Sequence, residues 1–105
     1  MTPNEYQDLC KETITEESNN MNYLALGLAS ESGEVAGKQK KVIRGDYELE
    51  DIQHLLIAEL GDCLWYIAMI ARYLGVGLED VMIANIEKLK QRALNDKIKG
   101  DGDER

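Results

Sequence analysis

The sequence has very little cysteine, histidine or proline. Among its 105 residues are two cysteines, one histidine and one proline. Two isolated cysteines do not make a disulfide framework, and they fit a reduced, cytoplasmic protein. The single histidine, His54, argues against a di-iron carboxylate bundle, because such a bundle needs two Glu-x-x-His motifs. We therefore expect His54 to be a surface or interface residue.

Long apolar runs and positive charge are also scarce. The longest near-apolar run, residues 63–71, is too short to span a bilayer, and residues 1–12 lack the basic and apolar regions of a signal peptide. Twenty acidic residues against twelve basic ones give a formal net charge of −8, which repels phosphate backbones. We expect no membrane partner and no nucleic-acid partner, and an acidic surface that suits divalent cations.

Hydrophobic residues recur at helical spacing in four segments, and no segment alternates with period two over a useful length. Thr2, Pro3 and Glu5 predict a capping box at the first helix, and residues 18–20 predict a turn that caps the second. The expected helices cover residues 3–16, 21–43, 50–74 and 78–94. Residues 1–105 should therefore form a single all-α domain, a four-helix bundle with a polar tail from about residue 95.

Acidic pairs three residues apart occur five times, so this spacing alone is weak evidence for a site. Two pairs, Glu31 with Glu34 and Glu59 with Asp62, interrupt apolar helical stripes and should point into the bundle. Buried like charges cannot stay ionised without compensation, so these pairs predict raised pKa values, basic partners or a bound cation. Hard oxygen ligands on facing helices suit Mg²⁺ or Mn²⁺.

Basic and polar side chains accompany the acidic pairs. Asn85, Lys88 and Arg92 are three and four residues apart, which places them on one face of the last helix. Lys38 extends the face of Glu31 and Glu34 by one turn. By themselves, these residues could equally be a solvated stripe and an i, i+4 ion pair between Glu34 and Lys38.

Taken together, the acidic and basic residues resemble the MazG-type nucleoside triphosphate pyrophosphohydrolases of the all-α superfamily. The family's mark is Glu-x-x-Glu, a spacer, and then Glu-x-x-Asp. Here it reads Glu31-Ser-Gly-Glu34, twenty-four residues, and Glu59-Leu-Gly-Asp62. Flanking segments that also look like the family are GLASESGEVAGKQKKVIRGD, ELGDCLWYIAMIARYLGVGLEDV, NIEKLKQR and the tail IKGDGDER.

The resemblance implies a MazG-like bundle that works as a homodimer or a dimer of dimers. It implies Mg²⁺-dependent hydrolysis of a nucleoside triphosphate to the monophosphate and pyrophosphate, as nucleotide-pool house-cleaning. The implied metal ligands and catalytic residues are Glu31, Glu34, Glu59 and Asp62, with Glu34 as general base. The implied substrate-binding residues are Lys38, Asn85, Lys88, Arg92 and Arg105, with a tail that includes Lys99 and Asp103 folding over the nucleotide.

Two other interpretations stay open. A phosphoribosyl-ATP pyrophosphohydrolase or a dUTPase/dCTPase-like enzyme would share the chemistry and differ in the nucleotide. A catalytically inert helical module that dimerises and binds a protein partner would also explain the apolar stripe and the acidic surface. Trp65 and Tyr66 lie in the most apolar helix, where core packing is a simpler expectation than contact with a base.

Overall fold

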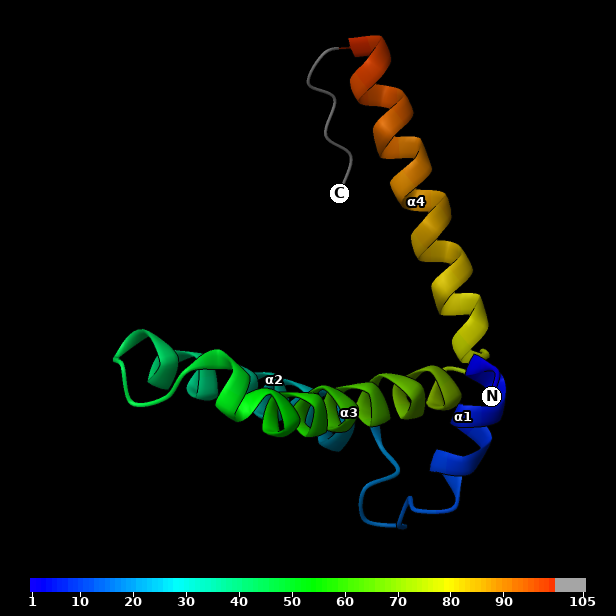
Figure 1. Cartoon of the computed structure of the whole chain (residues 1–105). Coiled ribbons are helices and arrows are strands. Elements are labelled where there is room, and N and C mark those ends of the chain that lie inside the picture. Colours follow the sequence, from blue (N-terminus) through cyan, green and yellow to red (C-terminus); the bar gives the residue numbers. More distant parts are fainter. Residues whose placement is uncertain (100–105) are drawn as a thin grey trace.

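The protein is built of helices. A computed structural model describes residues 1–99, and their side chains as far as residue 96. This part of the chain contains four helices and no strand, which confirms the all-α prediction. The helices are α1 (Pro3–Lys11), α2 (Met21–Ile43), α3 (Leu49–Tyr73) and α4 (Leu78–Lys99), as Figure 1 shows.

Side chains cap the starts of α1 and α2 as the sequence predicts. The Thr2 hydroxyl accepts from the backbone N–H of Glu5, and the Glu5 carboxylate accepts from the N–H of Thr2. Asn20 caps α2 by accepting from the N–H of Tyr23. These contacts satisfy N–H groups that the first turn of a helix leaves without partners.

The end of α1 was predicted wrongly, because the helix stops at Lys11 and not near residue 16. The Thr13 hydroxyl donates to the Cys10 carbonyl, and Thr15 and Ser18 bond to each other through side chain and backbone. Hydroxyl side chains of this kind offer the backbone an alternative to the helical pattern. The result is an ordered loop, with Ser18 buried, between α1 and α2.

The two longest helices, α2 and α3, pack along each other as a hairpin (Figure 1). Gly45 ends α2 with a φ of +85°, and Gly75 ends α3 with a φ of +80°. Residues with a side chain rarely adopt this left-handed conformation, so glycine is the residue that closes a helix there. The hairpin brings the middle of α2 beside the middle of α3.

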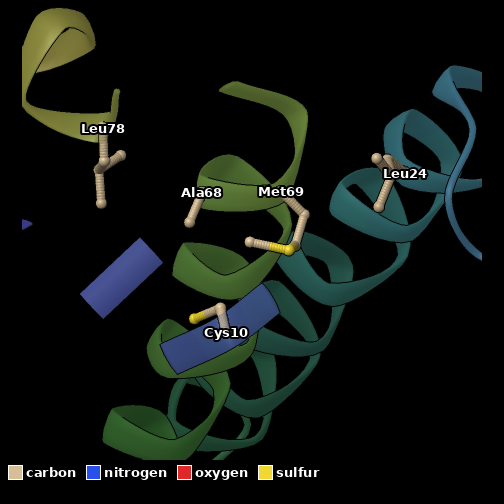
Figure 2. Packing of buried hydrophobic residues seen from close by; sticks show 5 residues of the cluster. All are labelled: Cys10, Leu24, Ala68, Met69 and Leu78. Atoms are coloured by element: carbon tan, nitrogen blue, oxygen red, sulfur yellow. The ribbon is translucent and has the colours of Figure 1, made fainter. Parts of the chain in front are cut away.

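The core lies at one end of the hairpin, where all four helices meet. Its buried residues are Cys10, Leu24, Ala68, Met69 and Leu78 (Figure 2). Leu24 and Met69 are completely inaccessible to solvent. Because so few side chains are fully buried, the packing of this one region holds α1, the hairpin and the start of α4 together.

Helix α4 leaves this core and projects away from the hairpin (Figure 1). Among the described residues, it contacts α1 and α3 but not α2. Every residue from Glu79 to Gln91 is exposed. The helix also continues to Lys99, beyond the predicted end, since no glycine or proline follows Leu94 until Gly100. Within one chain, the apolar side of α4 is therefore not packed into a bundle.

Helix α3 is long and apolar enough, by length and composition alone, to cross a membrane. It has 25 residues, and an 18-residue window of it has a mean hydropathy of 1.4. The sequence had predicted that no segment spans a membrane, because its longest near-apolar run, residues 63–71, is too short. This is weak evidence, because the core helix of a soluble protein passes the same test. Glu59 and Asp62 in its middle would be costly in lipid.

Candidate functional site

Three acidic side chains converge where α2 and α3 lie side by side. Glu31 comes from α2, and Glu59 and Asp62 come from α3. Each offers one carboxylate oxygen, and these three oxygens all lie within 4.8 Å of one another. Residues three apart in a helix are neighbours on its surface, so Glu59 and Asp62 meet Glu31 from one side of α3.

The two glutamates of the cluster are set deeper than the aspartate. Glu31 and Glu59 are half-buried, while Asp62 is exposed at the opening. Burial raises the pKa of Glu31, and the charges of Asp62, Glu59 and Glu34 raise it further. The cluster therefore favours a proton or a cation between its carboxylates.

Glu59 shows that the cluster is electrostatically incomplete. One of its oxygens pairs with the Lys38 ammonium at 3.5 Å, a long contact. Its other oxygen is buried and has no hydrogen-bond partner among the described residues. A buried carboxylate oxygen without a partner lowers the stability of the fold. Carboxylate oxygens are also ligands that Mg²⁺ prefers. The three side chains thus fit a hard divalent cation.

Cys63 is adjacent to the cluster, and its surroundings disfavour the ionised thiol. Burial raises the pKa of its thiol, and the charges of Glu31, Glu59 and Asp62 raise it further. The thiolate, which is the reactive form, is disfavoured there.

Glu34 stands apart from the three converging acids. It is exposed, one turn beyond Glu31, and lines a cavity of about 220 Å³ with basic residues at the end of α2. The other lining residues are Gly37, Lys38, Lys40, Lys41 and Arg44. Lys38 forms its ion pair with Glu59, and not with Glu34 as the i, i+4 alternative supposed. The sequence argument did not single out Lys40 and Arg44.

The predicted basic residues of α4 do not join the cluster within the described part of one chain. Asn85 and Lys88 are exposed and Arg92 is half-buried, all on a helix without contacts to α2. Their assignment to the substrate stays a prediction. The tail residues Asp103 and Arg105, and the side chain of Lys99, lie outside the described part of the chain.

A second cavity, of about 370 Å³, opens directly beside the cluster. Its walls are Thr13, Glu31, Asp62, Trp65 and Tyr66. The sequence predicted that the two aromatic residues pack in the core, and both are half-buried against the core cluster. It did not single out Thr13. Only the early end of α1, set by the hydroxyl side chains of the loop, brings Thr13 to this place.

Comparison with known proteins adds a family to this geometry. Residues 19–95 match the MazG nucleotide pyrophosphohydrolase domain. A relative called Gene 37 protein, from Mycobacterium phage L5, is 39% identical over 87 residues, which is 81% of this chain and 76% of the relative. No solved structure matches the chain. The matched segment contains all three converging carboxylates, and it confirms the resemblance seen in the sequence.

Proposed function

Because the chain belongs to the MazG nucleotide pyrophosphohydrolase family, we propose that it hydrolyses a ribo- or deoxynucleoside triphosphate to the monophosphate and pyrophosphate. The observation that carries this proposal is the cluster of Glu31, Glu59 and Asp62, with a buried Glu59 oxygen that has no partner among the described residues. In the cell, such an activity would remove unwanted nucleotides from the cytoplasmic pool.

The cofactor in this proposal is Mg²⁺, with Mn²⁺ as a substitute. Glu31, Glu59 and Asp62 would hold it, and Glu34 would complete the set by a change of rotamer. When bound, the ion supplies the positive charge that draws triphosphate oxygens to an acidic site. The basic side chains near the site, Lys38 among them, lie toward the end of α2.

The chain's own residues would carry the proton transfer. Glu34 is exposed, and it lies close enough to Glu31 for its charge to raise the pKa of Glu31. We assign to Glu34 the role of accepting a proton from the attacking water. The oxygen of this water forms a new bond to phosphorus, and the bridge between the α- and β-phosphates breaks. Pyrophosphate leaves with the electron pair of that bond.

A second copy of the chain would bring α4 to the site. Asn85, Lys88 and Arg92 do not reach the carboxylates of their own chain through any contact of the described α4 with α2. The same helix exposes Met82, Ile83 and Ile86 along an apolar cavity of about 560 Å³. Such an apolar surface favours association, so the proposal includes a homodimer or a dimer of dimers.

Two alternatives differ in what they predict. A phosphoribosyl-ATP or dUTPase/dCTPase-like enzyme would release pyrophosphate from one narrow class of substrate. An inert interaction module would release none and would gain no stability from Mg²⁺. The name of the phage relative states no activity, so it favours neither alternative.

The test is a panel of ribo- and deoxynucleoside triphosphates, with pyrophosphate and orthophosphate followed separately, with and without Mg²⁺. We expect pyrophosphate release that requires the metal and falls at least about 100-fold in Glu59→Gln, the scale seen when charge-stabilising groups are removed. Glu50→Gln, an exposed acid on the same helix, is the matched control. Mg²⁺-dependent release from Glu59→Gln at the normal rate would contradict the assignment of the site.

A further inference from the structure

The cavity beside the carboxylate cluster has one aromatic side and one acidic side. Trp65 and Tyr66 form the aromatic side, and Glu31 and Asp62 form the acidic side. Trp65 follows Asp62 by three residues on α3, so the two side chains are neighbours on one face of the helix. A ligand bound at the carboxylates would therefore have one end at the indole ring.

We propose that this cavity binds the nucleoside part of the substrate, with the base stacked on Trp65 and Thr13 setting the position of the indole. This inference rests on the proposed function, because it specifies where the substrate of that same site lies. It also gives the nucleotide a direction along the hairpin of α2 and α3.

The first argument is that Trp65 is held in place from two sides. Its indole N–H donates to the Thr13 hydroxyl oxygen at 2.7 Å, and that hydroxyl donates its own proton to the Cys10 carbonyl at 2.7 Å. Tyr66 packs edge-on against Trp65, with ring centroids 4.9 Å apart and an interplanar angle of 83°. Since the N–H is already used, the indole offers a ligand its aromatic surface and no free donor.

The second argument is that Tyr66 forms a rigid wall. A Cβ atom at Gly27 would overlap the Tyr66 ring, so the ring lies directly on the backbone of α2. A fixed pair of aromatic rings is a surface on which any nucleobase can stack.

The third argument concerns charge on the two sides of the cluster. Glu31 and Asp62 line the aromatic cavity, which has no basic side chain in its lining, and their oxygens that do not hold the metal can accept hydrogen bonds from sugar hydroxyls or base amino groups. Toward the other end of the hairpin, Lys38, Lys40 and Lys41 line a basic cavity. The neutral nucleoside thus fits the Trp65 side, and the triphosphate extends from the metal ligands toward the lysines.

The chain offers a direct probe, because Trp65 is its single tryptophan. We would follow the intrinsic fluorescence of the protein while adding unphosphorylated adenosine, guanosine, cytidine, uridine and thymidine, and separately inorganic tripolyphosphate with Mg²⁺. We expect saturable quenching by at least one nucleoside and none by tripolyphosphate. Absence of quenching by every nucleoside, or equal quenching by tripolyphosphate, would overturn the proposal.

Kinetics of variants give a second measurement. Loss of stacking in Trp65→Ala should raise KM for the nucleotide about 5- to 150-fold, with a smaller change in kcat and unchanged inhibition by tripolyphosphate. Trp65→Phe should recover part of the loss, and Tyr73→Ala, an exposed aromatic of the same helix, should have no effect. An unchanged KM in folded Trp65→Ala, checked by circular dichroism, would contradict base stacking.

Thr13→Val tests the positioning role of the hydroxyl. It keeps the shape of the side chain and removes both hydrogen bonds, so the indole is free to turn. We expect the ratio of kcat/KM between the best and the worst base to shrink, and Thr13→Ser to restore it. Nucleoside quenching without pyrophosphate release would leave this cavity intact and refute the proposed reaction, so the two failures are distinguishable.

Discussion

The hairpin of α2 and α3 carries the acidic residues of the proposed site, and the projecting α4 carries basic residues assigned to it. The hairpin is packed along its length and holds the three converging carboxylates. Helix α4 carries Asn85, Lys88 and Arg92, is exposed from Glu79 to Gln91, and is anchored in its first turn by hydrogen bonds to α1. The comparison shows that local packing within one chain brings the acidic residues together, while the basic residues of α4 stay apart from them.

Complementation between two inactive variants has the largest expected effect and tests this comparison most directly. Glu59→Gln and Arg92→Ala should each lower pyrophosphate release at least about 100-fold. If α4 serves the hairpin of another copy, a mixed dimer contains one intact site. An equal mixture of the two variants should then recover about a quarter of the normal rate, because half of the dimers are mixed and each has one good site of two.

The control for complementation is Glu59→Gln mixed with Glu31→Gln, two changes within the same carboxylate cluster. Every site in that mixture lacks one carboxylate, so no recovery is expected. Recovery in both mixtures, or in neither, would contradict the exchange of α4 between copies.

Substitutions in the core and on α4 should differ in their effect on the free energy of unfolding, because only the core is tightly packed. Met69 is completely buried at the meeting point of the helices, and Met69→Ala should lower the free energy of unfolding by about 2–5 kcal/mol. Ile86 on α4 is half exposed, so within one chain Ile86→Ala should cost less than about 0.5 kcal/mol. Urea unfolding, monitored by far-ultraviolet circular dichroism, measures both.

Unfolding measured at several protein concentrations tests whether a second copy covers α4. If α4 is covered by a second copy, the stability of the normal protein rises with concentration, and Ile86→Ala weakens this dependence. Met69→Ala should be destabilised by a similar amount at every concentration. Lys90→Ala, an exposed neighbour on α4, is the control. A concentration-independent effect of Ile86→Ala would exclude a covering partner at this face.

The anchoring of α4 depends on two side chains of α1. Gln7 is buried, donates to the carbonyls of Ala68 and Val76, and accepts from the N–H of Leu78. Asn4 accepts from the N–H of Glu79. These bonds join the end of α3 to the start of α4, so α1 sets the direction in which α4 leaves the core.

Gln7→Leu should therefore be destabilising even though it adds apolar surface. It leaves buried backbone groups without partners, and each such group costs about 1–3 kcal/mol. The free energy of unfolding should fall accordingly, and KM should rise more than kcat falls because Lys88 and Arg92 are displaced. Asp8→Asn, a change at the exposed residue next to Gln7, is the control. Equal stability of Gln7→Leu and the normal protein would argue against this anchoring role.

Local signals in the sequence predicted most of the fold. Thr2, Glu5 and the turn at residues 18–20 predicted helix starts, because a capping side chain acts on neighbouring residues. The direction of α4 was not predictable in this way. It rests on bonds from Gln7 to groups 61 to 71 residues away, which no periodic pattern encodes.

The candidate site was predictable to a similar degree. The interrupted apolar stripes predicted that both acidic pairs point into the bundle. The structure brings Glu31 and Glu59 together with Asp62, which is exposed at the opening, but the prediction was wrong for Glu34, which is exposed and outside the cluster. Residues three apart in a helix differ by about 60° in direction, so Glu34 turns away from the seam that Glu31 faces. The cavity beside Trp65 needed the loop at Thr13, whose side-chain hydrogen bonds overrode the expected continuation of α1.

The smallest predicted effect concerns pH and separates the carboxylate cluster from the rest of the acidic surface. The folded protein holds a proton on Glu31 more tightly than the unfolded chain does, because burial and neighbouring acids raise its pKa above the ordinary value of 4.5. Without metal, the free energy of unfolding should therefore fall as the pH rises from that value through the raised pKa. Stabilisation by added Mg²⁺ should grow over the same range, since the ion and the proton compete.

Thermal unfolding with and without Mg²⁺ measures both trends. Glu31→Gln should flatten them, and Glu16→Gln, an exposed acid in the loop, should not. Identical slopes in the two variants would mean that the cluster does not bind the proton or the ion as proposed.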